Sequence, residues 1–221
     1  MKNVVCAVAV LFLVATAAPA HEGHPSGAGE IMFERFPTHR GLYQPPVAKL
    51  LEEGIVEQYG LEEFAAVVLT NELHQHVGIY TVLGAKMGVR AREVLQAPTR
   101  QVKAVMETTK EQPFACALDG IQMALGSTFG QNLIEVADNE EPAIAGTFTW
   151  QERQVRIMLK AEYQEKLKGM IMAAREKHGD LTPAYFDEIA ERCYEVWAAW
   201  DRVTVFDIAM NRLEEAAETA E

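Results

Sequence analysis

The chain has 221 residues, 49% of them hydrophobic, and its 20 Lys and Arg against 32 Asp and Glu give a formal net charge of -12 at pH 7. Because this charge repels the phosphate backbone of nucleic acids, we expect no nucleic-acid partner, whereas a metal cation would be attracted. The length and apolar content suit one substantial domain with a helical appendage.

Residues 1–20 have the composition of a secretory signal peptide. Lys2 supplies the positive start, residues 4–14 form the apolar stretch, and residues 18–20 (Ala-Pro-Ala) provide a cleavage site of small residues. No later stretch reaches the roughly 18 consecutive apolar residues that a membrane span needs. We therefore expect a periplasmic or secreted protein without a stable membrane anchor after cleavage.

The cysteines fit an exported chain that does not depend on a disulfide framework. Cleavage after Ala20 would remove Cys6 and leave Cys116 and Cys193. One bridge between these two is an open alternative. Buried free thiols are the other alternative, because both residues lie in apolar helical patterns.

The segment after the signal peptide is interpreted as an extended N-terminal arm over residues 21–46. It contains Gly, Pro, Ser and His with little periodicity. Cleavage after Ala20 would make His21 the new N-terminus. Its amine and ring could then chelate copper together with His24.

The first elements of the body are predicted from helical spacing. Residues 47–58 have apolar side chains on one face, and Gly60 closes this helix. Residues 61–70 fit either a helix or a strand. A second helix is predicted from about residue 77 to 95, and residues 102–108 alternate like a strand.

The remaining pattern completes the predicted fold. A helix covers residues 114–125, with Cys116 and Asp119 in its first turn. Strands follow at 133–136, 144–149 and 155–159, with a hairpin loop at 138–142, and helices follow at 162–177 and from 183 to about 217. The fold class is therefore α+β: a helix-strand-helix-three-strand mixed sheet domain over residues 47–160, then a helical region over 161–221 with a pair of long helices.

His74, His76, Cys116 and Asp119 form a plausible metal-ligand set. Imidazole nitrogen and thiolate sulfur suit zinc and related transition metals. Side chains at 74 and 76 of one helix point about 200° apart, so both reach one ion only if a helix begins near His76. Glu72 and His76 are the alternative chelate if the helix starts earlier. A helix N-terminus would stabilise a thiolate at Cys116, and Asp119 is either a ligand or an acceptor that orients a histidine ring.

The first of two family motifs begins at His74. A known family has the motif H-G-H-x-C-P-G, followed after three residues by G-x-R-M. This chain matches the histidines, the glycine, the arginine and the methionine of that pattern, without a gap, with His74, His76, Gly84, Lys86 and Met87.

The second motif, C-x-x-D-A-I-Q with a Gly-Ser/Cys-Thr-x-Gly turn, is matched in order and spacing by Cys116, Asp119, Gly120, Ile121, Gln122 and residues 126–130. On these motifs, residues 69–159 resemble the FmdE domain of formylmethanofuran dehydrogenase, which defines the FmdE-like family. The resemblance implies an α+β metal-binding domain with a divalent transition metal, zinc most likely, as its cofactor.

Two departures from the family pattern concern the metal. Gly78 stands at the position of the motif's cysteine and Tyr80 at that of its glycine. The chain also lacks any Cys-x-x-Cys pair, so the zinc ribbon found in several family members is absent.

Three function classes follow. The first is an exported metal-binding protein that uses His74, His76 and Cys116, with room for a small-molecule ligand and with a homodimer left open. The second is a metal-dependent enzyme with an open coordination position and Glu72 or Asp119 as general acid or base. The third is a structural or interaction module without metal, if the ligands lie far apart. Lys86 and Arg90 are expected on a solvated helix face, or less readily beside the site as receptors for an anionic group.

Overall fold

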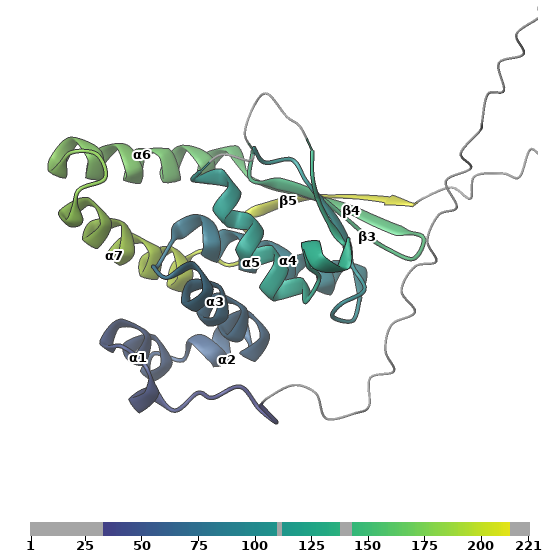
Figure 1. Ribbon diagram of the computed structural model, residues 1–221, viewed down its shortest axis with the longest axis horizontal. Helices are drawn as coiled ribbons and strands as arrows, with labels where there is room; N and C mark the ends of the chain where they lie inside the picture. Colours follow the sequence, from purple (N-terminus) through teal and green to yellow (C-terminus); the bar gives the residue numbers. More distant parts are fainter. Residues whose placement is uncertain (1–32, 110–111, 138–142, 213–221) are drawn as a thin grey trace, which may run out of the picture. The chain divides into compact units, whose positions relative to one another are not determined.

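The structure is a computed structural model that describes residues 33–109, 112–137 and 143–212. The predicted signal peptide, His21, His24 and the predicted loop at 138–142 lie outside these residues. Figure 1 shows the helices and strands with their labels.

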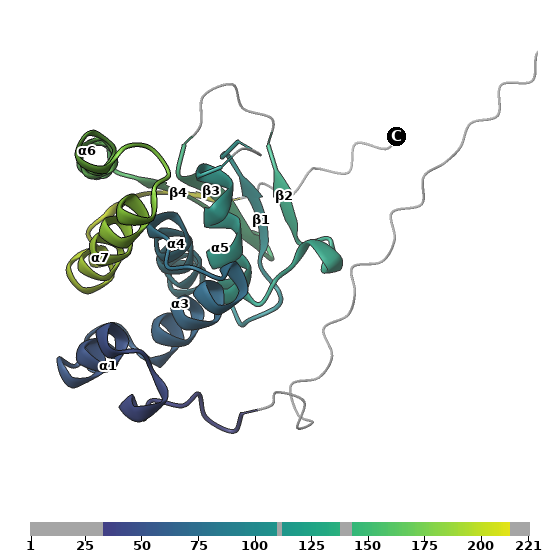
Figure 2. The ribbon, with the colours of Figure 1, turned by 60° about the vertical axis from the view of Figure 1, so that its left-hand side comes forward.

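The strands are β1 (Lys103–Met106), β2 (Ile134–Val136), β3 (Ala145–Trp150), β4 (Arg153–Leu159) and β5 (Phe206–Arg212). They form one mixed sheet in the order β2-β1-β3-β4-β5, seen in Figures 1 and 2. β1 and β2 are parallel, whereas the other neighbours are antiparallel. The predicted hairpin between β2 and β3 is therefore wrong, because β1 lies between these two strands and pairs with both.

The N-terminal segment is more helical than the sequence indicated. A short 3-10 turn, η1 (Arg40–Leu42), precedes α1 (Pro45–Glu52), α2 (Ile55–Tyr59) and α3 (Leu61–His74). The predicted single helix over 47–58 is two helices, because Gly54 adopts a left-handed conformation with φ of 85° between them. The ambiguous residues 61–70 are helical. The arm packs on the body through Phe36 and Tyr43, whose rings meet Phe64 edge-on at 6.0 and 5.5 Å.

The centre of the molecule is α4 (Ile79–Leu95), which packs on β3 and β4 and against α3, α5 (Ala117–Leu125) and α7 (Pro183–Ala199). The contact between α4 and α5 is very close. A Cβ on Gly84 would lie 2.0 Å from the carbonyl oxygen of Ala117, and one on Gly120 would lie 2.2 Å from the carbonyl oxygen of Thr81. Small residues at both positions are therefore required by backbone-to-backbone packing.

The C-terminal region contains two long helices, α6 (Ala161–His178) and α7, and then returns to the sheet. The last helix ends at Ala199 and not near residue 217 as predicted. Trp200 leaves the helical conformation with φ of -95° and ψ of 93°, and Asp201 accepts a hydrogen bond from the backbone of Val203 at 2.8 Å. Strand β5, which was not predicted, pairs with β4 along its full length.

These elements confirm the α+β class, with a mixed sheet and two long helices after its first four strands. Within the described ranges, no helix combines the length and apolar character needed to cross a membrane.

Candidate functional site

A tight turn between α3 and α4 brings His74 and His76 together. α3 ends at His74, Gln75 adopts a left-handed conformation with φ of 61°, and Gly78 is the N-cap of α4. The two imidazole rings lie with centroids 4.3 Å apart. The helix predicted to begin near His76 begins at Ile79, but the break between two helices places both rings on one side of the turn.

Asn71 holds this turn in place. Its side-chain oxygen accepts hydrogen bonds from the backbone N–H of Gly78 at 3.0 Å and from the hydroxyl of Thr81 at 2.9 Å. Its amide group donates to the carbonyl of Val67 at 2.8 Å. A single side chain therefore connects the last turn of α3 to the first turn of α4.

Asp119 lies against the other side of His74. Its carboxylate Oδ2 is 2.8 Å from Nδ1 of His74, and the two side chains are 12% (His74) and 31% (Asp119) exposed. A carboxylate in this position fixes the orientation of the ring and favours the tautomer with the proton on Nδ1. The second ring nitrogen, Nε2, is then the unprotonated one.

Cys116 comes just before α5, at the end of the 3-10 turn η2 (Phe114–Cys116), and is its N-cap. Burial, together with the charge of Asp119, raises the pKa of the Cys116 thiol. The expected stabilisation of a thiolate by the helix N-terminus is therefore wrong for the metal-free protein. Cys193 is fully buried, and both cysteines are free.

His74, Cys116 and Asp119 line one open pocket of about 330 Å³. The rest of its wall was not anticipated from the sequence and consists of Gln112, Ala115, Leu118, Gln122 and Phe129. Gln122 belongs to the second family motif, and its side-chain oxygen accepts a hydrogen bond from the backbone of Phe129 at 3.3 Å. The motif thus contained a signal for this contact.

His76 and Glu72 lie differently from the three residues of this pocket. The ring of His76 lies beside that of His74 but is not part of the pocket wall. Burial, and then the neighbouring His74, lower the pKa of His76, which keeps its ring in the neutral form that binds metals. Glu72, the alternative partner of His76, lines a different cavity.

The donors at these positions decide whether a metal ion fits. In residues 33–109, 112–137 and 143–212, no three His, Cys, Asp or Glu side chains are grouped closely enough to hold an ion as they stand. The donors on the pocket wall itself are the imidazole of His74, the thiol of Cys116 and the carboxylate of Asp119, which is engaged with His74. These types suit zinc, but the arrangement fits an ion only if His76 turns toward His74 and Cys116.

The two departures from the family motif have structural roles. Gly78, at the motif's cysteine position, is the N-cap of α4. The ring of Tyr80 packs edge-on against Phe114 at 5.3 Å. Burial raises the pKa of Tyr80 to about 12, so its hydroxyl stays protonated at pH 7.

Lys86, on the arginine of the first motif, is not on a solvated face as expected. Its side chain is fully buried, and its ammonium donates a hydrogen bond to Glu63 at 2.6 Å. It is therefore a core residue and cannot receive an external anion.

Comparison with known proteins agrees with the motif assignment. The sequence model of FmdE, described as "FmdE, Molybdenum formylmethanofuran dehydrogenase operon", matches residues 73–206. Among solved structures, the chain is similar to an FmdE-like protein of tungsten formylmethanofuran dehydrogenase from Syntrophus aciditrophicus. The identity is 17% and the TM-score 0.43, over 69% of this chain and 73% of that one. No curated protein matches the sequence.

Proposed function

The chain belongs to the FmdE family, and we propose that it is an exported metal-binding protein of this family. It holds a divalent transition metal, zinc in preference, at the pocket of His74 and Cys116, with His76 as a further ligand. Asp119 orients His74 in this proposal.

The observation that carries the proposal is the contact between Asp119 and Nδ1 of His74 at 2.8 Å. Metal-binding histidines commonly donate their second ring nitrogen to a carboxylate, which fixes the ring and increases the basicity of the nitrogen that meets the metal. Cys116 lines the same pocket. A fixed imidazole and a thiol on one concave surface are the donor types that zinc prefers.

His76 can complete a three-donor set without a change in the fold. Its ring centroid is 4.3 Å from that of His74, and the residue follows the left-handed Gln75 in the turn between two helices. Rotation about side-chain bonds is the only movement that it needs. The raised pKa of Cys116 means that metal binding must release a proton, so the affinity falls as the pH is lowered.

The size of the pocket favours a second candidate, a metal-dependent enzyme. Its volume of about 330 Å³ greatly exceeds that of an ion and lies at the lower end of the roughly 300–1,000 Å³ that is usual for small-molecule sites. With three protein ligands or fewer, an ion keeps a position for water or substrate. An organic molecule that binds only to the metal-loaded protein would support this candidate.

The proposed export depends on residues 1–20, with their positive start, apolar stretch and small-residue cleavage site. Mass spectrometry of the protein from a periplasmic or culture fraction tests it. A mature N-terminus at His21 is the expected result. An uncleaved chain in the cytoplasm would contradict export.

Elemental analysis of the full chain, produced without a histidine tag, tests metal binding. The parent is compared with His74→Ala and Cys116→Ser, and with His39→Ala as a control that changes an exposed histidine outside the pocket. We expect near-stoichiometric metal in the parent and the control, and loss in the two pocket variants. Circular dichroism checks that all four proteins are folded.

Two outcomes would contradict the proposal. One is a parent that contains no metal after growth with added zinc. The other is a metal content that both pocket variants retain. Either result would leave a structural or interaction module as the remaining function class.

A further inference from the structure

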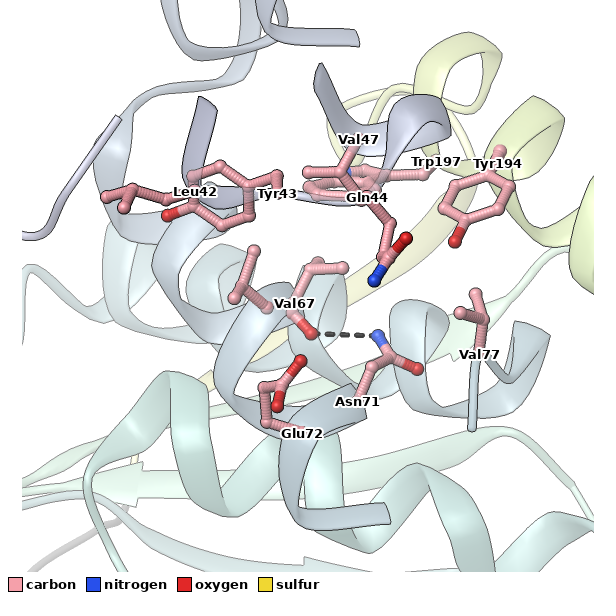
Figure 3. Close-up of a pocket in the computed structure, with 11 residues that line it drawn as sticks. Leu42, Tyr43, Gln44, Val47, Val67, Asn71, Glu72, Val77, Tyr194 and Trp197 are labelled. Carbon is pink, nitrogen blue, oxygen red and sulfur yellow. Dashed lines mark hydrogen bonds between the residues drawn. The ribbon is translucent and has the colours of Figure 1, made fainter. Parts of the chain in front are cut away.

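A second cavity, of about 220 Å³, lies between the N-terminal segment, α3 and α7. Figure 3 shows its lining, which consists of Leu42, Tyr43, Gln44, Val47, Val67, Val68, Asn71, Glu72, Val77, Tyr194 and Trp197. Eight of these eleven residues precede residue 73, where the family match begins. Family membership therefore does not account for this cavity.

The floor of the cavity is apolar and well ordered by packing. Val67 and Trp197 are only 1% and 2% exposed. Trp197 stacks on Phe64 with ring centroids 5.7 Å apart, and Tyr43 is held by the edge of Phe64 and by a hydrogen bond to the carbonyl of Pro37. The aromatic side chains of the wall are thus fixed in place before any ligand arrives.

Polar groups converge at the mouth of the cavity. In Figure 3 the side chains of Gln44 and Tyr194 point from one side toward Asn71 on the other. Within the described part of the chain, no side chain or backbone group forms a hydrogen bond with the side chain of Gln44, Glu72 or Tyr194. The hydrogen-bonding capacity of these three side chains is therefore left for a ligand.

The charge of the lining selects the sign of the ligand. Glu72 contributes a carboxylate, and no Lys, Arg or His is among the lining residues. The whole chain also has a formal net charge of -12. An anionic ligand is repelled on both counts, whereas a cation gains a charge-assisted hydrogen bond to Glu72.

The volume sets the size of the ligand. An apolar cavity of about 150 Å³ holds one benzene molecule, so the 220 Å³ here accommodates a somewhat larger body. We propose that this cavity binds a small organic cation, a primary amine joined to an aromatic or branched aliphatic group. The ammonium lies between Glu72 and Gln44, and the apolar body rests on Val67 and Trp197.

The test uses the full chain, labelled with ¹⁵N and treated with EDTA so that an amine cannot bind through a metal. Phenethylamine is the probe, and 2-phenylethanol and phenylacetate are neutral and anionic molecules of similar shape. The readout is the indole N–H resonance of Trp197, assigned with Trp197→Phe. That group is buried and has no acceptor among the described residues. Trp150 bonds Gln101 away from the cavity and serves as the internal reference.

We expect phenethylamine to shift the Trp197 resonance at lower concentration than either analogue, with no shift of Trp150. Glu72→Gln should weaken phenethylamine binding about tenfold, because a charged hydrogen bond at a partly solvated site is lost. Binding of 2-phenylethanol should not change. Glu57→Gln is the matched control, since Glu57 is exposed and outside the lining.

Val47→Phe fills the cavity from α1 and should abolish binding of both phenethylamine and 2-phenylethanol. Cys116→Ser should bind phenethylamine like the parent, because the cavity does not depend on the proposed metal site. The proposal is overturned if phenethylamine causes no shift throughout the millimolar range. It is equally overturned if the amine binds no more tightly than the alcohol, or if Glu72→Gln leaves that preference intact.

Discussion

The ammonium nitrogen of Lys86 lies 2.6 Å from a carboxylate oxygen of Glu63, and both side chains are completely buried. The ammonium also lies 4.0 Å from the centre of the Tyr59 ring, and the other carboxylate oxygen accepts a hydrogen bond from Arg202 at 2.9 Å. Burial lowers the pKa of Lys86, and Glu63 acts in the opposite direction. This network connects α3, α4 and the turn after α7.

The two halves of this pair should differ in their cost on removal. Glu63→Leu takes the carboxylate away from a buried ammonium, and we expect a loss of about 3–5 kcal/mol of unfolding free energy. Lys86→Met leaves Glu63 paired with Arg202, which is 14% exposed, so its cost should be smaller. Urea unfolding at pH 7 measures both. The reverse order would contradict the proposed role of Arg202.

Gly84→Ala tests the close approach of α4 and α5. The added Cβ would lie 2.0 Å from the backbone oxygen of Ala117, so the helices must separate. We expect a loss of about 2–3 kcal/mol in unfolding free energy, within the usual range for overpacked cores. Gly169→Ala, in α6 with no atom within 4 Å of the added Cβ, should instead stabilise by up to about 1 kcal/mol. Equal effects of the two substitutions would refute the packing argument.

Glu188 should make the stability of the protein depend on pH in acid. A hydrogen bond from Lys177 is the main cause that lowers the pKa of Glu188 from 4.5 to about 2, and His178 and Arg192 add to it. A lowered carboxyl pKa contributes stability that is complete above pH 4.5 and is lost as the pH falls toward 2. In Glu188→Gln this part of the pH dependence should disappear.

Urea midpoints measured between about pH 5 and about pH 2 check this prediction. Parent and Glu188→Gln should differ most at the upper end of the range and converge at the lower end. Glu191→Gln changes an exposed carboxylate on the same helix and should follow the parent. A constant difference between parent and Glu188→Gln at all pH values would show that the ionised carboxylate is not the cause.

Asp119 should affect metal affinity through His74. If it orients the ring and is not itself a ligand, Asp119→Ala should lower zinc affinity about ten- to hundredfold without abolishing binding. Asp119→Asn keeps an oxygen acceptor for Nδ1 of His74 and should recover part of the loss. Competition with a coloured zinc chelator measures the affinities, with Asp207→Asn on β5 as control. Complete loss in both Asp119 variants would make Asp119 a direct ligand.

Periodicity in the sequence was sufficient for most of the local structure. The helices around residues 79–95 and 161–178 and the four strands up to Leu159 lie where apolar spacing and turn residues predicted them. These signals are local, because a helix or a strand buries one face whose residues recur at its own period. The family motifs also pointed to His74 and Asp119, which the structure brings into contact at 2.8 Å.

Contacts between distant segments were decided only in the tertiary structure. Strand β5 alternates apolar residues at Phe206, Ile208 and Met210, but its place in the sheet depends on pairing with β4, about 50 residues earlier. Lys86 looked like a surface residue because its partner Glu63 is on another helix. Burial of a charge is favourable only where a counter-charge meets it, and no local pattern specifies that meeting.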